Sequence, residues 1–268
     1  MAAKEHVKLP NHCEGFLFKP VGRAPLGCLI VFHERYGLVQ HTLDVANRLA
    51  ENGYLVLAPD LFSLWEGDKA ALNRGDVRAV VSDADSVRQL DHWIAYIKTQ
   101  APAAIAGKIA LFGVCQSGRY PIVVASKRRD ISACVIFYGA VHERDWGTSS
   151  DQPVAMPDMV KDLTSPMFFV LAEKDHTMSV DQMRRLRDAL ESADIAYRMR
   201  VVADMPHGFI NDTMPGRYRE AESEKAWEAL LAFLHDVFVQ GWPNGRIVWD
   251  FLSSKSRDYD FSKNRRME

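Results

Sequence analysis

Residues 108–126 read KIALFGVCQSGRYPIVVAS, and this stretch joins a strand-like run to a helix-like run through one tight turn. The run at 108–113 is short and apolar, which is typical of a strand buried on both faces. Residues 118–126 continue as a predicted helix. The segment between them, GVCQSG at 113–118, is centred on Cys115. A sharp turn from a strand into a helix lifts its central side chain clear of the backbone, and small neighbours let the two elements approach.

The same alternation of strand-like and helix-like runs extends along the rest of the chain. Short apolar runs predict strands at 26–32, 54–58, 108–113, 133–138, 167–172 and 197–202. Apolar residues at helical spacing predict helices at 42–52, 82–99, 118–126, 180–192 and 220–238. Strands that are apolar throughout and alternate with helices are typical of a parallel sheet covered on both faces. The sequence therefore predicts the α/β class, with one doubly wound domain over residues 1–239, a mostly parallel sheet and helices on both faces.

Two segments do not fit this alternation. Residues 61–81 follow a predicted strand, so we expect an irregular or short-helical loop at the carboxyl edge of the sheet. A disordered tail rarely carries many aromatic residues. We therefore expect the C-terminal extension at 240–268 to pack on the body of the domain or on a second subunit, forming a homodimer. Its aromatic side chains, set among charges, are Trp242, Trp249, Phe251, Tyr259 and Phe261.

The composition is that of an ordinary globular protein. The chain has 268 residues, of which 47 % are hydrophobic and 25 % charged, and 33 basic against 35 acidic residues give a formal net charge of −2. These values exclude a disordered or collagen-like chain, and they give no electrostatic basis for binding nucleic acid or an acidic membrane. The longest apolar runs, 28–32 and 167–172, are far short of the ~18 residues that a membrane helix needs.

The cysteines bear on the cellular compartment and on metal binding. Cys13, Cys28, Cys115 and Cys134 form no CxxC pair and no Cys/His spacing typical of zinc. The N-terminus lacks the apolar run of a signal peptide, so we expect a reducing, cytoplasmic setting with free thiols. The sequence has no G-x-G-x-x-G after a strand, no P-loop and no HExxH. We therefore expect neither a cofactor nor a metal.

Cys115 occupies the tip of the predicted turn, which is the position of the nucleophile in the elbow of an α/β-hydrolase. A free cysteine is more often a small buried core residue, and that alternative stays open for Cys115 taken alone. The start of a helix favours negative charge, and therefore the thiolate form of a cysteine. A serine nucleophile at Ser117 fits poorly, because Ser117 lies beyond the tip and starts the helix.

A cysteine nucleophile needs a base and a carboxylate that orients the base. In this fold the acid and then the histidine follow the nucleophile along the chain, on loops after later strands. Asp175 follows one predicted strand, and His207 follows the next. The sequence therefore predicts a triad of Cys115, His207 and Asp175. His176 is a competing base, but it adjoins Asp175, and neighbours on one loop rarely reach an imidazole site from opposite sides.

The loop at 33–37 (HERYG) follows the first strong predicted strand. In this fold that loop supplies one backbone N–H to the oxyanion hole, and the residue after the nucleophile, Gln116, supplies the other. Two preset donors around a developing oxyanion are worth roughly 3–4 kcal/mol each. Glu34 is unusual in such a loop, because a carboxylate near a thiol keeps the thiol protonated. An ordinary surface glutamate in a charged loop is the alternative.

Several segments together resemble the dienelactone hydrolase family of α/β-hydrolases. They are HERYGL at 33–38, YLVLAPDLF at 54–62, GVCQSG at 113–118, FYG at 137–139, EKD at 173–175 and HGFIND at 207–212. These segments stand in the family's order and span about residues 26–238. The resemblance implies an α/β-hydrolase fold, a cysteine in place of the commoner serine nucleophile, and cleavage of a small-molecule lactone or carboxylic ester.

The resemblance also assigns roles to residues of this chain. It implies that Cys115 is the nucleophile, His207 the base and Asp175 the acid that orients the base. It implies that the backbone N–H groups of Arg35 and Gln116 form the oxyanion hole.

Three more side chains receive roles from the resemblance alone. It implies that Glu34 pairs with the thiol of Cys115 and keeps it neutral and resistant to oxidation until substrate displaces the carboxylate. It also implies that Tyr36 and Tyr138 line the substrate pocket.

The chain departs from the family pattern at two places. Ser117 stands where the family often has glycine. Enzymes specific for dienelactones hold the substrate carboxylate with an arginine a few residues after the catalytic histidine, but the stretch 209–212 (FIND) has none before Arg217. Arg74 and Arg78 are candidates to replace that arginine. The substrate therefore stays open between a dienelactone, another lactone and a broader range of esters. The alternative function is a non-catalytic or thiol-sensing protein on a hydrolase scaffold.

Overall fold

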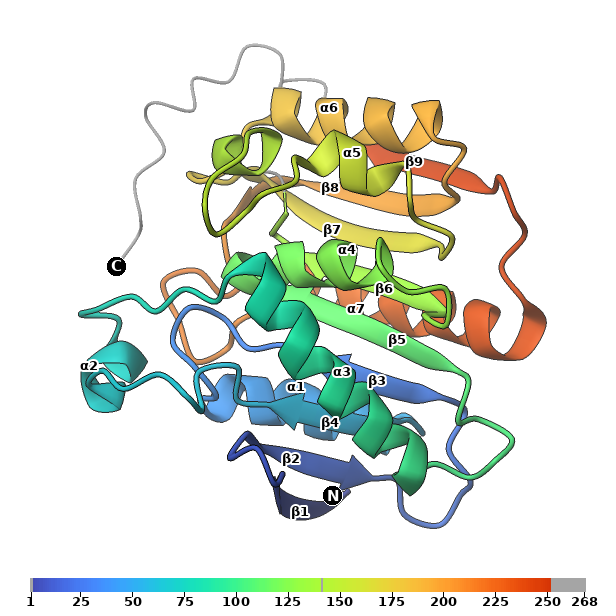
Figure 1. Cartoon of the computed structure of the whole chain (residues 1–268). Helices are drawn as coiled ribbons and strands as arrows, with labels where there is room; N and C mark the ends of the chain where they lie inside the picture. Colours follow the sequence, from blue (N-terminus) through green and yellow to red (C-terminus); the bar gives the residue numbers. More distant parts are fainter. Residues whose placement is uncertain (1, 141, 252–268) are drawn as a thin grey trace.

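A computed structural model of the chain, described over residues 2–140 and 142–251, forms one sheet flanked by helices (Figure 1). The described residues give a nine-stranded sheet in the spatial order β1-β2-β4-β3-β5-β6-β7-β8-β9. Its strands are β1 (Ala3–Lys8), β2 (Glu14–Lys19), β3 (Cys28–Val31), β4 (Leu55–Pro59), β5 (Ile109–Val114), β6 (Ala133–Phe137), β7 (Met167–Lys174), β8 (Tyr197–Pro206) and β9 (Ile247–Phe251).

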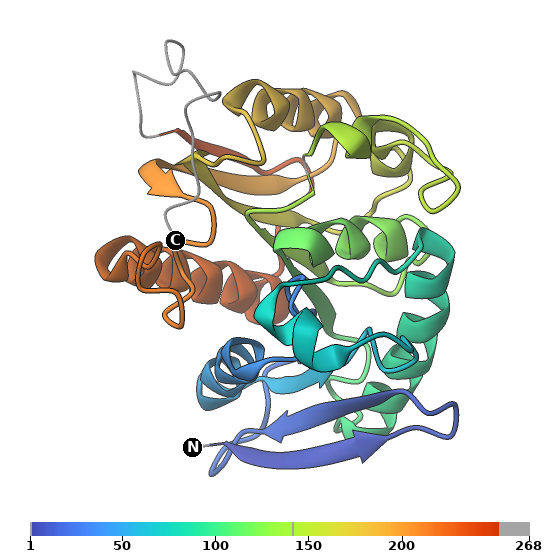
Figure 2. The ribbon, with the colours of Figure 1, turned by 90° about the vertical axis from the view of Figure 1, so that its left-hand side faces the viewer.

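Helices cover both faces of this sheet, as Figure 2 shows. One face carries α1 and α7, and the other carries α3 and α4. The helices are α1 (Gln40–Glu51), α2 (Lys69–Arg74), α3 (Asp83–Gln100), α4 (Arg119–Ala125), α5 (Met156–Val160), α6 (Val180–Ser192) and α7 (Glu220–His235), with the shorter turns η1 (Cys115–Gly118), η2 (Glu143–Trp146) and η3 (Asp236–Gln240). Over the described ranges, no helix is long and apolar enough to cross a membrane.

The strands predicted from apolar runs are β3 to β8, and they pair in parallel. The prediction of a doubly wound, mostly parallel α/β sheet is therefore confirmed. Strand β3 pairs with both β4 and β5, so the chain winds outward from β3 in two directions. In such sheets ligands bind beyond the carboxyl ends of the strands, near this switch point.

Strands β1 and β2 were not predicted, and they pair antiparallel at one edge of the sheet. The sequence of β1, AKEHVK, is mostly polar, and one of its six residues is buried. A strand at the edge of a sheet commonly carries charged residues, which prevent pairing with other chains. β1 therefore lacks the apolar run that identified the central strands, and the run in β2, at 16–18, is only three residues long.

The predicted C-terminal extension contributes β9, which pairs in parallel with β8 at the opposite edge of the sheet. The rings of Trp249 and Phe251 stack at 5.6 Å, with Arg187 and Arg184 of α6 over them. The aromatic residues at 259 and 261 lie outside the described residues. The boundary at residues 239 and 240 and the homodimer stay predictions.

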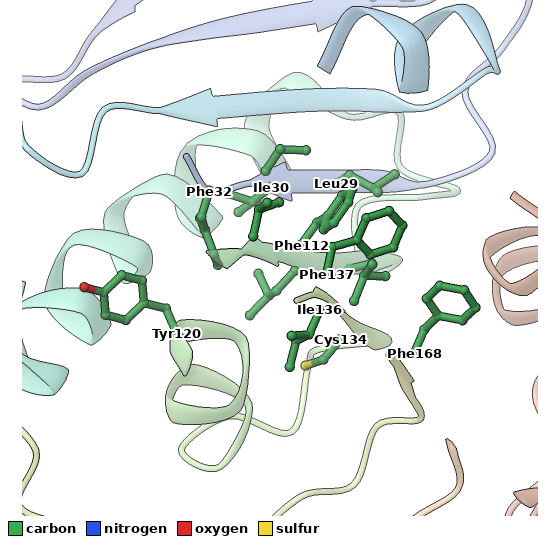
Figure 3. Close-up of a cluster of buried hydrophobic side chains, with 14 of the residues drawn as sticks. Leu29, Ile30, Phe32, Phe112, Tyr120, Cys134, Ile136, Phe137 and Phe168 are labelled. Carbon is green, nitrogen blue, oxygen red and sulfur yellow. The ribbon is translucent and has the colours of Figure 1, made fainter. Parts of the chain in front are cut away.

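An aromatic core supports the strand that leads into the turn at Cys115. Phe112 of β5 meets Phe137 of β6 edge to face at 4.9 Å, and Phe137 also packs against Phe168 and Trp227. Figure 3 shows three of these rings, Phe112, Phe137 and Phe168, in a cluster of buried side chains that includes Ile30 of β3. Since close-packed interiors resist local displacement, the end of β5 is a rigid support for the turn.

A buried ion-pair network anchors the helix that follows the turn. Arg119, the first residue of α4, is 3 % exposed. Its Nε and Nη2 donate to the two carboxylate oxygens of Asp83 at 2.9 and 2.8 Å, and its Nη1 donates to Asp145 at 3.3 Å. Asp83 opens α3 and Asp145 lies in η2, so one guanidinium joins three elements.

Arg119→Leu is expected to lower the free energy of unfolding by about 3–5 kcal/mol, because it leaves buried carboxylates without their cation. Lys161→Leu is the matched control, since its ion pair with Asp158 is exposed and its loss costs less than about 1 kcal/mol. Urea unfolding followed by circular dichroism measures both values. Similar losses in the two variants would contradict the assignment of Arg119 as an anchor.

Candidate active site

Cys115 lies at the carboxyl end of β5, where the chain turns directly into η1. Its φ of 56° is in the left-handed region, which a non-glycine residue adopts at an energetic cost. The turn is tight, because a Cβ on Gly113 would lie 2.5 Å from the carbonyl oxygen of Ser117. This conformation matches the sharp turn expected from the sequence, and the Cys115 side chain is partly exposed.

Ser117, the alternative nucleophile, is 2 % exposed and has a structural role. Its Oγ accepts a hydrogen bond from the Val114 N–H at 2.9 Å and lies 2.9 Å from the Val114 carbonyl oxygen, to which it donates. The hydroxyl therefore closes the turn under Cys115. A glycine at this position would lack these bonds, so the departure from the family pattern strengthens the turn.

His207 and Asp175 continue in a row from the thiol of Cys115. His207 Nε2 lies 3.2 Å from Cys115 Sγ, and His207 Nδ1 lies 2.7 Å from Asp175 Oδ2. Asp175 directly follows β7 and His207 directly follows β8, so neighbouring parallel strands deliver both side chains to one edge. His176 packs edge to face on the His207 ring at 5.4 Å, and His207 occupies the place between thiol and carboxylate.

Thr177 holds the carboxylate of this row, and the sequence analysis missed it. Its N–H and its hydroxyl both donate to Asp175 Oδ1 at 2.7 Å, which leaves Oδ2 for His207. The spacing Asp-x-Thr was the available signal, because an aspartate commonly accepts from the backbone two residues later.

In this row, burial and the neighbouring charges shift the pKa values of His207 and Asp175 in opposite directions. Burial lowers the pKa of His207, but the charges of Asp175 and Cys115 and the hydrogen bonds to both raise that pKa well above its usual 6.5. Burial likewise raises the pKa of Asp175, whereas the His207 charge and the hydrogen bonds from His207 and Thr177 hold it below its usual 3.8. The row therefore favours a protonated imidazole beside the Asp175 carboxylate.

Glu34 is buried beside this row and forms its hydrogen bonds with two neutral groups. The Asn211 amide donates to Oε2 at 2.9 Å, and the Tyr138 hydroxyl donates to Oε1 at 3.5 Å. Thr213 orients the amide, since its N–H and hydroxyl donate to Asn211 Oδ1 at 3.1 and 2.7 Å. The pairing of Glu34 with the Cys115 thiol stays a prediction. Sequence analysis missed Asn211 as a partner of Glu34.

The two tyrosines predicted to line the pocket differ in their position. Tyr138 is fully buried, and its ring lies edge to face against His207 at 5.0 Å. Burial and then the nearby Glu34 charge raise the pKa of Tyr138 well above its usual value. Tyr36 lines a surface cleft instead, with the Arg35 guanidinium 5.1 Å from its ring centroid. Tyr138 therefore contacts the candidate base, whereas Tyr36 lines the surface cleft.

The predicted oxyanion-hole residues come from two segments, since Arg35 lies in the loop after β3 and Gln116 follows Cys115 in η1. Over residues 2–140 and 142–251, the Arg35 N–H donates no hydrogen bond to another group of the chain. The side chains of both residues bind the segment that covers this edge: Gln116 Nε2 donates to the Ala79 carbonyl at 2.8 Å, and Arg35 donates to the Gly75 carbonyl. The Arg35 backbone donor is therefore available to a ligand, and the oxyanion role of Arg35 and Gln116 stays a prediction.

Two surface hollows adjoin these loops. The larger has a volume of about 710 Å³ and is lined by residues that include Arg35, Arg74, Asn211 and Arg217. The smaller, about 370 Å³, is lined by residues that include Gln116 and Arg78. The two arginines proposed from the sequence as carboxylate partners therefore face different hollows. Throughout the described ranges, no group of three His, Cys, Asp or Glu side chains is placed to hold a metal ion.

The parallel sheet and the strained turn at the end of β5 define the class as an α/β-hydrolase. A comparison with family profiles then identifies the family. The profile of the dienelactone hydrolase family matches residues 13–238, and the chain belongs to that family.

Individual relatives agree with this assignment. A "Putative carboxymethylenebutenolidase" of Salmonella typhi is 29 % identical over 212 residues, which cover 77 % of this chain and 76 % of that protein. A protein of the same description from Escherichia coli K12 is 29 % identical over 213 residues, with the same coverage. The crystal structure of a "Putative Dienelactone Hydrolase" from Klebsiella pneumoniae superposes with a TM-score of 0.77 at 24 % identity, covering 87 % of this chain and 98 % of that one. The chain is thus a hydrolase of the carboxylic ester and lactone class.

Asp175→Asn is expected to lower the pKa of His207, because it removes the carboxylate charge that raises it. The raised His207 pKa stabilises the fold below about pH 6.5 and is lost as pH rises through the folded value. The lowered Asp175 pKa stabilises above about pH 3.8 and is lost as pH falls. The difference in unfolding free energy between wild type and Asp175→Asn should therefore be largest between about pH 3.8 and about pH 6.5.

Urea unfolding across this pH range, with an NMR titration of the His207 ring, measures both effects. The matched control is His92→Gln, since His92 is exposed on α3, far along the chain from this row. A stability difference that stays constant with pH would contradict the coupling of Asp175 to His207.

Proposed function

We propose that the enzyme cleaves a small carboxylic ester or lactone through a thioester on Cys115, with His207 as base and Asp175 as its orienting acid. One observation carries the proposal: Cys115 Sγ, His207 and Asp175 form a continuous row with contacts of 3.2 and 2.7 Å. A nucleophile within reach of a base, which a third group orients, is the geometry that covalent catalysis requires.

The chemistry follows from this row. His207 takes the proton of the Cys115 thiol, and the thiolate attacks the ester carbonyl carbon. A C–S bond forms, and the carbonyl electron pair moves to oxygen. The Arg35 and Gln116 N–H groups stabilise that oxyanion. The tetrahedral intermediate collapses to a thioester, and the leaving alkoxide takes a proton from His207. Water then gives a proton to His207 and attacks the thioester, which releases the acid and restores the thiol.

A cleft that reaches Asn211, the partner of Glu34, supports a small substrate. The cleft of about 710 Å³ begins at the loop that holds Arg35 and Tyr36 and fits a small molecule. Guanidinium groups of Arg35 and Arg74 line it, which suits an acid or lactone with an anionic group. The relatives described as carboxymethylenebutenolidases are consistent with a lactone, and the lack of an arginine at 209–212 leaves other esters open.

Cys115→Ala is expected to reduce the kcat for p-nitrophenyl acetate by about a thousandfold or more, because it removes the covalent nucleophile. Cys13→Ala, which removes a buried thiol far along the chain, is the matched control and should retain wild-type turnover. Ser117→Ala tests the alternative nucleophile on the same turn. Retention of more than about a tenth of the rate by Cys115→Ala would sink the proposal.

Iodoacetamide is expected to label the folded protein once, at Cys115. The other three cysteines are fully buried, and burial raises the pKa of Cys28 and Cys134 to about 12. Intact-mass analysis of wild type and Cys115→Ser measures the labelling, and unfolding in urea should expose every thiol. A first label on Cys13 would show that Cys115 is not the reactive thiol. Labelling and reversible peroxide oxidation of Cys115 without ester turnover would favour the thiol-sensing alternative.

A further inference from the structure

His33 is a buried histidine next to the candidate site, and both of its ring nitrogens are engaged. The side chain follows β3 and the residue is 2 % exposed. Its Nε2 lies 3.0 Å from the Leu61 backbone nitrogen, and its Nδ1 lies 2.7 Å from the Glu34 carbonyl oxygen. The mechanism proposed above does not use this residue.

The partners of His33 determine where its proton lies. The Leu61 N–H is a donor, so Nε2 must accept from it. The proton of the neutral ring is then on Nδ1, which donates to the Glu34 carbonyl. The Phe62 ring packs against the imidazole at 4.6 Å, and Asp60 Oδ1 lies 3.6 Å from Nε2. These contacts hold the ring between the ends of β3 and β4.

The Glu34 carbonyl receives a second hydrogen bond from its own loop. The Gly37 N–H donates to it at 3.2 Å and closes a turn over residues 34–37. Gly37 has a φ of 79°, which a glycine adopts without strain. Two donors therefore fix the direction of one carbonyl.

That carbonyl belongs to the same peptide unit as the Arg35 N–H. A trans peptide is planar, so its C=O and its N–H point in opposite directions. Fixing the Glu34 carbonyl on the side of His33 therefore turns the Arg35 N–H to the other side. That N–H donates to no group of the described chain, which leaves it for a ligand.

We infer that His33 is a positioning residue, which aims the Arg35 N–H at the oxyanion by holding the Glu34 carbonyl through Nδ1–H. The inference rests on the proposed function, since the oxyanion exists only if a carbonyl is attacked. The structural alternative is that His33 merely ties the ends of β3 and β4 together through the Leu61 N–H.

Two amides separate these roles, because each reproduces one ring nitrogen. In His33→Asn the side-chain amide nitrogen falls near the place of Nδ1, so it keeps the donor to the Glu34 carbonyl. In His33→Gln the amide falls near the place of Nε2, so it keeps the contact with the Leu61 N–H and loses the donor to Glu34.

The measurement is ester turnover of wild type, His33→Asn and His33→Gln with p-nitrophenyl acetate. His33→Gln should lose about tenfold to a hundredfold in kcat with little change in KM, since a misdirected oxyanion donor acts in the transition state. His33→Asn should stay within about threefold of wild type. The reverse order, or equal rates in the two variants, would overturn the inference.

Two further readouts exclude a merely structural effect. An aryl trifluoromethyl ketone accepts the thiolate at its carbonyl carbon and places the resulting oxyanion in the hole, so its inhibition constant should weaken with kcat in His33→Gln. Alkylation of Cys115 by iodoacetamide displaces iodide and forms no oxyanion, so its rate should stay within about twofold in both variants. A parallel loss of alkylation in His33→Gln would assign the effect to general disruption and overturn the inference.

The same probes remain informative if His33→Gln does not fold. In wild type and His33→Asn, the amide proton of Arg35 should shift downfield in NMR spectra when the ketone adduct forms, since it then donates to an oxyanion. An unchanged Arg35 resonance in an inhibited enzyme would overturn the inference. Failure of the proposed function is distinguishable, because it appears as wild-type turnover that survives Cys115→Ala.

Discussion

The left-handed backbone of Cys115, at φ 56°, is the constraint on which the candidate site depends. Such a conformation costs about 1–3 kcal/mol and persists where the surroundings over-determine it. Here Gly113 leaves room for the chain to turn back on itself, the Ser117 hydroxyl closes the turn, and Arg119 anchors the helix that follows. The result is a thiol held clear of the backbone and 3.2 Å from His207.

The parallel sheet supplies the second condition, because it brings distant residues to one edge. Cys115, Asp175 and His207 follow β5, β7 and β8, whose carboxyl ends point the same way. Burial makes an unpaired charge costly. The His207 imidazole lies between the Cys115 thiol and the Asp175 carboxylate and contacts both groups. The low exposure of Asp175 and His207 therefore makes their interaction strong rather than weak.

A second polar row lies next to the first. Glu34 is held by the Asn211 amide and the Tyr138 hydroxyl, and Tyr138 in turn packs on the His207 ring. The loop of Glu34 also carries Arg35, so one loop holds both the carboxylate and the candidate oxyanion donor. His33 contacts this loop at the Glu34 carbonyl.

The sequence by itself determined the central strands β3 to β8, the helices α1, α3, α4 and α6 between them, and the candidate triad. Apolar runs, helical spacing and chain order are properties of local sequence, and parallel strands bring the loops that follow them to one edge. It did not reveal β1, β2 or β9. β1 is mostly polar, as edge strands commonly are, and the apolar runs of β2 (16–18) and β9 (247–249) are only three residues long. Only the tertiary structure decided the partners of Glu34, since Asn211 lies 177 residues away in sequence. Contacts between such loops depend on the three-dimensional positions of their side chains, and a local sequence pattern does not predict these positions.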